Sequence, residues 1–169
     1  MAVAQSIRER QIKVYSTSWC AHSRMSRALL QERGLAFETI DIERDPSAAR
    51  QVERWNNGYR STPTILLREI ITEPTAAELE RIFLESGARL LDLTVYLTTW
   101  CPDCRGTMKW LKAHGVSPKT VDIEADEEAA QKVENWNHGY RSVPTLDATL
   151  LLTEPSNEEL DAALGWSDS

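Results

Sequence analysis

The sequence predicts two tandem α/β domains, each with the element order β-α-β-α-β-β-α around a mixed four-stranded sheet. Two observations lead to this fold class. The 169 residues repeat without a gap at an offset of 81, so each unit has the size of a small domain. Within each unit, apolar residues alternate between strand-like and helix-like spacing. We place the two domains at residues 1–86 and 87–169.

The repeat is visible in several motifs that keep one register. W-C-A-H-S at Trp19–Ser23 aligns with W-C-P-D-C at Trp100–Cys104. G-Y-R-S at Gly58–Ser61 aligns with Gly139–Ser142, and P-T and T-E-P segments follow in both units. Chance matches would drift out of register, so we infer a tandem duplication. The short linker after Gly87 predicts that the two domains pack in a fixed relationship.

The first part of each unit predicts a strand, a helix and a second strand. Gln11–Thr17 and Leu93–Thr98 are rich in β-branched residues and short enough for buried strands. Helices follow over residues 23–33 and 104–114, where apolar side chains recur at helical spacing. F-E-T-I-D-I and K-T-V-D-I alternate as the second strands. The first cysteine of each unit therefore lies between a strand and a helix.

The second part of each unit predicts a helix, a hairpin and a covering helix. D-P-S-A-A-R-Q-V-E-R-W and D-E-E-A-A-Q-K-V-E-N-W predict helices led by acidic residues. P-T-I-L-L-R-E-I-I-T-E and P-T-L-D-A-T-L-L-L-T-E predict pairs of short strands, with tight reversals near Leu67–Glu69 and Asp147–Thr149. The last helices are expected after Pro74 and Pro155.

Composition and charge exclude several classes of function. The net charge of −7 argues against binding to nucleic acid or to an anionic membrane surface. No apolar run approaches the roughly 18 to 20 residues of a membrane span. Charges near the N-terminus interrupt the apolar core that a secretory signal would need, so we expect a cytoplasmic protein. Three cysteines cannot build a disulfide scaffold, which leaves chemistry as their expected role.

The C-x-x-C segment predicts a redox pair. A cysteine at the start of a helix meets unpaired backbone N–H groups and the positive end of the helix dipole, which both favour the thiolate. Cys101 is then the attacking nucleophile, and Cys104 is the resolving thiol that expels the product. The alternative is a zinc half-site, but the remaining cysteine and the histidines lack the paired spacing of zinc ligands, so no metal is expected.

W-C-P-D-C after a strand, with V-P-T about forty residues later, resembles the glutaredoxin family of the thioredoxin fold. Within that family, the T-E-P-T and T-E-P-S segments are most similar to mycoredoxin-like and small glutaredoxin-like redoxins. The resemblance covers both halves and implies thiol-disulfide exchange, cytoplasmic redox homeostasis and electron transport. It implies Cys101 and Cys104 as the redox pair and Cys20 as a lone nucleophile, with Pro63 and Pro144 as cis prolines beside them.

We predict that partners contact residues next to the cysteines. These are Trp19, Arg60, Thr62 and Pro63 in the first unit, and Trp100, Arg141, Val143 and Pro144 in the second. The tryptophans would form an apolar wall, and cis prolines would turn the preceding backbone toward the partner. The arginines would bind a carboxylate, with a surface ion pair as the equal alternative.

The expected co-substrate is a low-molecular-weight thiol, with no tightly bound cofactor. Glutathione-using members carry Gly-Gly and Asp before the last helix, where this chain has T-E-P, and an acidic residue there would weaken the binding of an anionic group. The candidates are mycothiol, bacillithiol or glutathione, or a flavoprotein disulfide reductase in their place. The expected substrates are disulfide-containing or S-thiolated proteins.

Ser23 stands where the second unit has Cys104, so the first unit cannot close an internal disulfide. Cys20 can still act by a monothiol route, in which a second thiol from solution regenerates it. The neighbouring His22 is either a solvated loop residue or a cation that favours the Cys20 thiolate. Two other functions stay open, namely an iron-sulfur or partner-binding scaffold without turnover and a redox sensor that links Cys20 to Cys101.

Overall fold

The computed structural model describes residues 2–3 and 6–167. The first half contains β2 (Ile7–Ser16), α1 (Ala21–Glu32), β3 (Glu38–Asp41), α2 (Pro46–Trp55), β4 (Thr64–Thr72), α3 (Ala76–Glu80) and a π-helical turn, η1 (Arg81–Glu85). The second half contains β5 (Arg89–Leu97), α4 (Pro102–Ala113), β6 (Lys119–Asp122), α5 (Glu127–Trp136), β7 (Thr145–Thr153) and α6 (Asn157–Ala163). β1 (Ala2–Val3) and β8 (Trp166–Ser167) pair near the chain ends. The mixed α/β class is as predicted.

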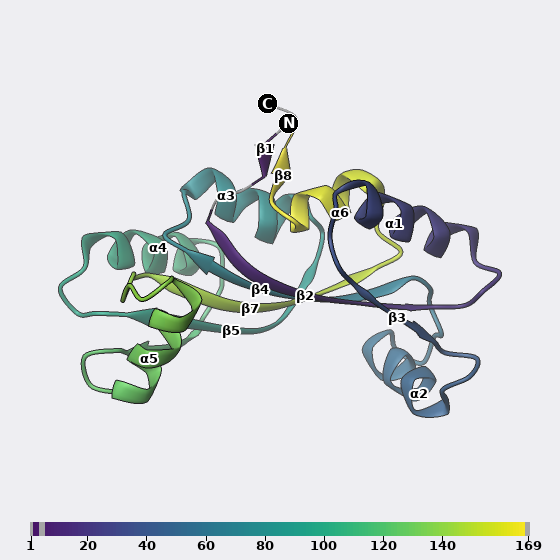
Figure 1. The fold of residues 1–169 in the computed structure, drawn as a ribbon, viewed down its shortest axis with the longest axis horizontal. Coiled ribbons are helices and arrows are strands. Elements are labelled where there is room, and N and C mark those ends of the chain that lie inside the picture. Colours follow the sequence, from purple (N-terminus) through teal and green to yellow (C-terminus); the bar gives the residue numbers. More distant parts are fainter. Residues whose placement is uncertain (1, 4–5, 168–169) are drawn as a thin grey trace.

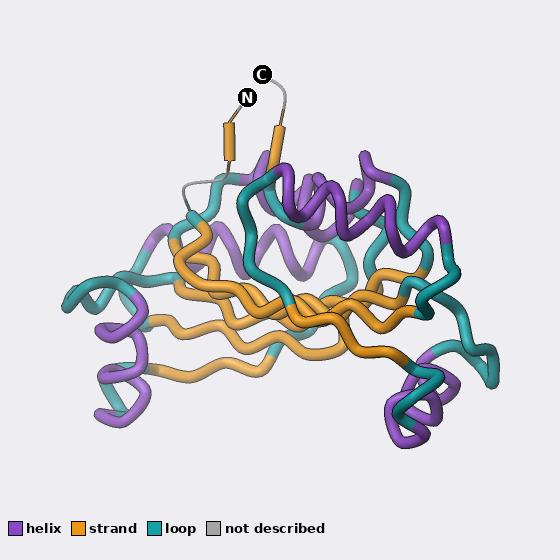
Figure 2. Tube along the Cα trace, turned by 45° about the vertical axis from the view of Figure 1, so that its right-hand side comes forward, coloured by secondary structure: helices purple, strands orange, loops and turns teal. Residues whose placement is uncertain are grey.

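The two halves share one sheet. Within the described residues it has six strands in the order β3-β2-β4-β7-β5-β6, with β2 parallel to β3, β5 parallel to β6, and antiparallel pairs elsewhere. Figure 2 shows this sheet as one layer between helices, and Figure 1 places α1, α3, α4 and α6 on one face with α2 and α5 on the other. The predicted fixed relationship between the halves is confirmed by this continuous sheet.

The predicted hairpins are wrong, because β4 and β7 each continue as one nine-residue strand. β4 has no Gly, Pro, Asn, Asp or Ser that would favour a reversal. In β7, Asp147 is held instead by Arg68 of β4, whose guanidinium donates two hydrogen bonds of 2.9 and 2.7 Å to its carboxylate. The straight strands pair with each other along their full length, from Thr64 opposite Thr153 to Thr72 opposite Thr145.

The central strands β4 and β7 join the sheets of the two halves. Arg68 lies opposite Thr149, and these residues are related by the 81-residue offset, so the pairing has two-fold pseudosymmetry. The predicted four-stranded sheet of one domain is therefore corrected. Each four-stranded unit consists of three strands of its own half and the central strand of the other, as in β3-β2-β4-β7. The division at residues 86 and 87 stays a prediction about the sequence repeat, because the folded units cross it.

The terminal helices are exchanged as well. α6 of the second half packs on α1 of the first, where the Arg33 guanidinium donates bonds of 3.0 and 2.8 Å to Asp161. α3 of the first half lies along α4 of the second (Figure 1). Beneath these helices one apolar core contains fully buried side chains of both halves, among them Leu30, Ile65 and Leu146. Burial of apolar surface thus holds the halves together as one body.

Smaller clusters attach the helices of the opposite face. The Tyr15 and Trp55 rings meet edge to face at 5.4 Å between centroids, and their counterparts in the second half, Tyr96 and Trp136, do so at 5.5 Å. Such pairs add about 0.5–1.5 kcal/mol to the stability gained by burial. Among the described residues, no helix has the length and apolar character needed to cross a membrane.

Candidate active sites

Cys20 caps the N-terminus of α1. Its Sγ accepts a hydrogen bond from the Ser23 backbone N–H at 3.4 Å, and its thiol donates to the Thr62 carbonyl at 3.6 Å. The first turn of α1 positions the sulfur, because Cys20 precedes the helix with extended backbone angles that let its side chain accept a bond from this turn. Ser23 is fully buried beneath it. The first site thus has one sulfur held by a helix N-terminus.

Cys101 has the same place at the start of α4. Its Sγ accepts a hydrogen bond from the Cys104 N–H at 3.1 Å and lies 3.8 Å from the Val143 carbonyl. Both cysteines are free thiols, and Cys104 is 2% exposed. The two thiols therefore lie one helical turn apart, as the C-x-x-C spacing predicts.

The electrostatics of the cysteines differ. Burial opposes ionisation of Cys20, but hydrogen bonds with Ser23 and Thr62 outweigh it and lower the pKa of the Cys20 thiol. Burial, together with the hydrogen bond to Cys101, raises the pKa of Cys104. Cys104 is therefore protonated at neutral pH, which suits a thiol that waits for a mixed disulfide to form.

The Thr62–Pro63 and Val143–Pro144 peptide bonds are cis. Both prolines are buried beside the cysteines, and the carbonyls of the preceding residues are the ones that face the two sulfurs. The predicted residues before the prolines are thus brought together with Cys20 and Cys101.

Each site also contains a segment of the other half. The Glu73 N–H donates to the Pro144 carbonyl at 2.8 Å, and the Glu154 N–H donates to the Pro63 carbonyl at 2.8 Å. Both glutamates have positive φ angles, of 50° and 49°, which turn the chain out of its strand toward the next helix. The sequence prediction missed this exchange. The signal that could have revealed it is the absence of turn residues in the middle of β4.

Each half has two strongly exposed aromatic side chains in its repeated motifs. Trp19 and Trp100 are 68% and 62% exposed, as a partner-facing wall requires, and Trp100 Nε1 donates to Glu124 at 2.8 Å. Tyr59 and Tyr140 belong to the repeated G-Y-R-S motif and are each 72% exposed. The sequence prediction did not select them.

The two predicted arginines lie in ion pairs. Arg60 is 3.4 Å from Glu53 and is mostly exposed. Arg141 bonds to Glu134 and, at 2.7 Å, to Glu127, and these carboxylates raise its pKa. The surface ion pair that the sequence left open is therefore present in both halves. Binding of a partner carboxylate by these arginines stays a prediction.

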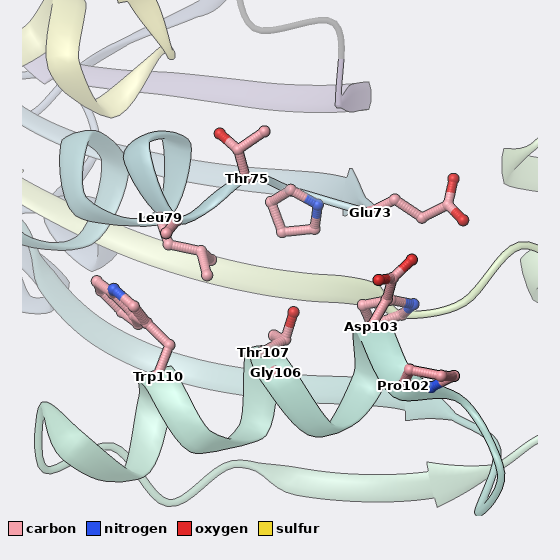
Figure 3. Close-up of a pocket in the computed structure, with 11 residues that line it drawn as sticks. Glu73, Thr75, Leu79, Pro102, Asp103, Gly106, Thr107 and Trp110 are labelled. Carbon is pink, nitrogen blue, oxygen red and sulfur yellow. The ribbon is translucent and has the colours of Figure 1, made fainter.

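A groove of about 460 Å³ runs from the second site along α4. Its walls come from both halves: Glu73, Pro74, Thr75, Ala76 and Leu79 from the first, and Pro102, Asp103, Gly106, Thr107, Trp110 and Pro144 from the second. Figure 3 shows α4 on one side of the groove and the start of α3 on the other. Pro102, the residue after Cys101, and the cis proline Pro144 both line it, so the groove begins beside Cys101.

The two sites lie at opposite ends of the sheet (Figure 1). β4 links them, since Thr62 before it contacts Cys20 and Glu73 after it contacts Pro144. A nine-residue strand spans about 30 Å, whereas disulfide-linked Cα atoms lie within about 7 Å. A Cys20–Cys101 disulfide within one chain is therefore excluded, which corrects the sensor hypothesis. Among the residues described, no group of three His, Cys, Asp or Glu could hold a metal ion.

Comparison with known proteins gives a consistent family. The glutaredoxin family model matches the chain twice, at residues 12–69 and 93–148. Mycoredoxin 1 of Corynebacterium glutamicum is 42% identical over 55 residues, which are 32% of this chain and 67% of that protein. A Mycobacterium tuberculosis protein that bears a glutaredoxin name is 39% identical over 74 residues, 43% of this chain and 88% of that protein. No solved structure matches significantly.

Proposed function

Because this chain belongs to the glutaredoxin family, we propose that it is a thiol-disulfide oxidoreductase with one dithiol and one monothiol site. The observation that supports the pairing of roles is the equivalence of Cys104 and Ser23. Each donates its backbone N–H to the nucleophilic sulfur, at 3.1 and 3.4 Å, but only one carries a second thiol. The backbone around the two sulfurs is thus the same, and the proposed reactions differ because one site lacks the second thiol.

At the dithiol site, the Cys101 thiolate attacks one sulfur of a substrate disulfide. An S–S bond forms to Cys101, and the other substrate sulfur leaves as a thiolate that takes a proton from water. Cys104 then loses its proton and attacks the Cys101 sulfur, which expels the second substrate thiolate. Two electrons pass to the substrate, and the protein is left with a Cys101–Cys104 disulfide. A low-molecular-weight thiol or a flavoprotein disulfide reductase restores the dithiol.

At the monothiol site, the Cys20 thiolate attacks an S-thiolated protein and takes up the small thiol. The target protein leaves as a free thiolate. A second small thiol then attacks the adduct, restores the Cys20 thiolate and leaves as a symmetrical disulfide. The lowered pKa of Cys20 supports this role, because the thiolate is the attacking species.

We propose mycothiol as the first co-substrate to test, because the relative from Corynebacterium glutamicum is named a mycoredoxin. Bacillithiol and glutathione are the alternatives. Glu73 and Glu154 lie beside the cis prolines, where an anionic end of a thiol would meet like charge. The location in the cytoplasm stays a prediction.

The test is the intact mass of the protein after oxidation with each thiol separately, followed by peptide mapping of the three cysteines. We expect a stable one-thiol adduct on Cys20 and an internal disulfide between Cys101 and Cys104. An unmodified Cys20 beside a second site that still cycles would contradict the monothiol role. A Cys101 that neither forms an adduct nor closes the disulfide would contradict the whole assignment.

A further inference from the structure

Seven of the eleven residues that line the groove beside Cys101 differ from their counterparts in the first half, and two of these differences concern the opening of the groove. Gly106 corresponds to Met25, and Asp103 corresponds to His22. A Cβ at Gly106 would meet no atom within 4 Å, so this wall of the groove is open. In the first half, Met25 stands at the position of Gly106, and His22 Nε2 donates to the Pro155 carbonyl of the segment before α6 at 2.7 Å. At the matching place the first half therefore has a larger residue and a hydrogen bond where the second half is open.

The open groove has two chemically distinct ends. Figure 3 shows the Glu73 and Asp103 carboxylates at the end near Pro102, and Trp110 and Leu79 at the other end. Both acidic side chains are exposed. Asp103 and Trp110 are seven helical residues apart, which separates the two ends by about 10 Å along α4. An extended peptide covers this distance in about three residues.

The surroundings of this site are acidic as well. Residues 122–141 carry six acidic and two basic side chains, whereas the matching residues 41–60 carry four of each. Three of these carboxylates bond to the residues predicted to contact partners, because Glu124 bonds to Trp100, and Glu127 and Glu134 bond to Arg141. A partner that approaches Cys101 therefore meets a negative field, whereas one that approaches Cys20 meets a balanced one.

We propose that this groove binds the polypeptide next to the target disulfide and selects a segment with a Lys or Arg close to the cysteine and an apolar residue beyond it. The cationic group lies between Glu73 and Asp103, and the apolar side chain lies between Trp110 and Leu79. This inference rests on the proposed function and adds the class of substrate to it. Because Glu73 and Leu79 come from the first half, that half contributes to the specificity of the second site.

The test compares two disulfide-linked peptides that differ only in a Lys or Glu two positions after the cysteine, and each carries a Leu three positions further on. Turnover is measured in a Cys20→Ser background, with hydroxyethyl disulfide as a small neutral substrate. We expect a higher kcat/KM for the Lys peptide, by about fivefold for each carboxylate it meets, and a smaller preference at high salt. Glu73→Gln should reduce the preference by about fivefold, and Glu80→Gln, on the exposed side of α3, should leave it unchanged.

A second pair of variants tests the open wall. Gly106→Met introduces the residue of the first half and fills the groove, and Gly106→Ala is the control that improves helix propensity without filling it. We expect Gly106→Met to lower kcat/KM for the Lys peptide about tenfold, because the peptide loses roughly one apolar contact in the groove. The rate of hydroxyethyl disulfide reduction should stay the same. Gly106→Ala should behave as the parent protein.

Equal rates for the two peptides, or a preference that Glu73→Gln leaves intact, would overturn the proposal. So would groove variants that change recycling by mycothiol and leave peptide reduction unaffected, because the groove would then be a site for the small thiol. These results differ from a failure of the proposed function. In that case the parent protein would reduce neither the peptides nor hydroxyethyl disulfide.

Discussion

The two candidate sites share a backbone framework and differ in the side chains of the five residues that follow Cys20 and Cys101. Four of these five positions differ. They are Ala21, His22, Ser23 and Met25 in the first half, and Pro102, Asp103, Cys104 and Gly106 in the second. The sulfur contacts to the helix N-terminus and to the residue before the cis proline are the same. The two halves therefore position the cysteine sulfur in the same way. They differ in the presence of a second thiol and in the size of the side chain at the position of Gly106.

The comparison also shows what each half provides to the other. β4 begins at one site and ends at the other, and β7 does the same in the reverse direction. A change in one half can therefore alter the site of the other half without touching its cysteine. The following variants separate the effects of the nucleophiles from those of the shared framework.

Replacing the two proposed nucleophiles should have the largest effect. Cys101→Ser should reduce disulfide reductase turnover to the uncatalysed rate, because Cys104 is buried and its pKa is raised. Cys20→Ser should retain most of this turnover and lose the removal of small thiols from S-thiolated proteins. Both rates are measured on the full chain with each variant. A Cys101→Ser protein that reduces disulfides as fast as the parent would show that the sites were assigned to the wrong roles.

Ser23→Cys should convert the first site to the chemistry of the second. Ser23 is fully buried at the position of Cys104, so the new thiol fits without a change in the backbone. We expect oxidation to remove two hydrogens and link Cys20 to the new thiol, with the stable small-thiol adduct on Cys20 lost. Peptide mapping after oxidation checks this outcome. An adduct as stable as that of the parent would mean that more than one side chain separates the two chemistries.

One difference in the framework is a buried ion pair of the first half. Arg10 and Glu69 of the first half lie 3.5 Å apart, where the second half has Leu91 and Leu150. Glu69 is fully buried, and desolvation raises its pKa to about 8, against a smaller opposing effect of Arg10. Because the folded state then holds this proton above the pH at which the unfolded chain releases it, stability falls as the pH rises from about 4.5 to about 8.

Arg10→Leu combined with Glu69→Leu should remove that slope. We expect the double variant to be about 1–4 kcal/mol more stable than the parent at pH values above about 8, and closer to it at pH values near 5. Urea unfolding at both pH values measures the difference. A double variant with the same pH slope as the parent would assign the slope to other groups.

The smallest expected effect concerns the hydrogen bond between His22 and the segment before α6. His22→Ala removes the 2.7 Å hydrogen bond to Pro155, which should lower the free energy of unfolding by about 1 kcal/mol. Asp103→Ala at the matching position should change it less, because its side chain is exposed at the open groove. Urea unfolding of the two variants compares them. Equal decreases in the free energy of unfolding would show that the His22–Pro155 hydrogen bond does not stabilise the contact between the halves.

The sequence predicts much of this structure because local patterns decide it. The strand before Cys20, the helix after it and the acid-led α2 and α5 follow from apolar spacing and caps, and the prolines before β4 and β7 lie where the motif predicts them. The hairpins failed because the choice between a reversal and a continuous strand depends on pairing with a distant segment. Arg68 and Asp147, 79 residues apart, illustrate this, since their bond forms only when β4 and β7 are both straight.

The candidate sites could likewise be predicted only in part. The cysteines and prolines carry their own motif, but the Glu73 and Leu79 wall of the second site comes from a segment that the sequence places in the other repeat. The ion pairs of Arg141 also depend on three-dimensional distances, since Glu127 is fourteen residues away in the chain.

The continuous central strands also affect how the protein matures on the ribosome. α6, which packs on α1 beside Cys20, lies at residues 157–163, so the first site is completed only when nearly the whole chain has been synthesised. A nascent chain that has just released its first half has Cys20 without the helix that packs on α1. Translation that stops before β7 therefore leaves the Cys20 site unfinished, although Cys20 and Pro63 have already been synthesised.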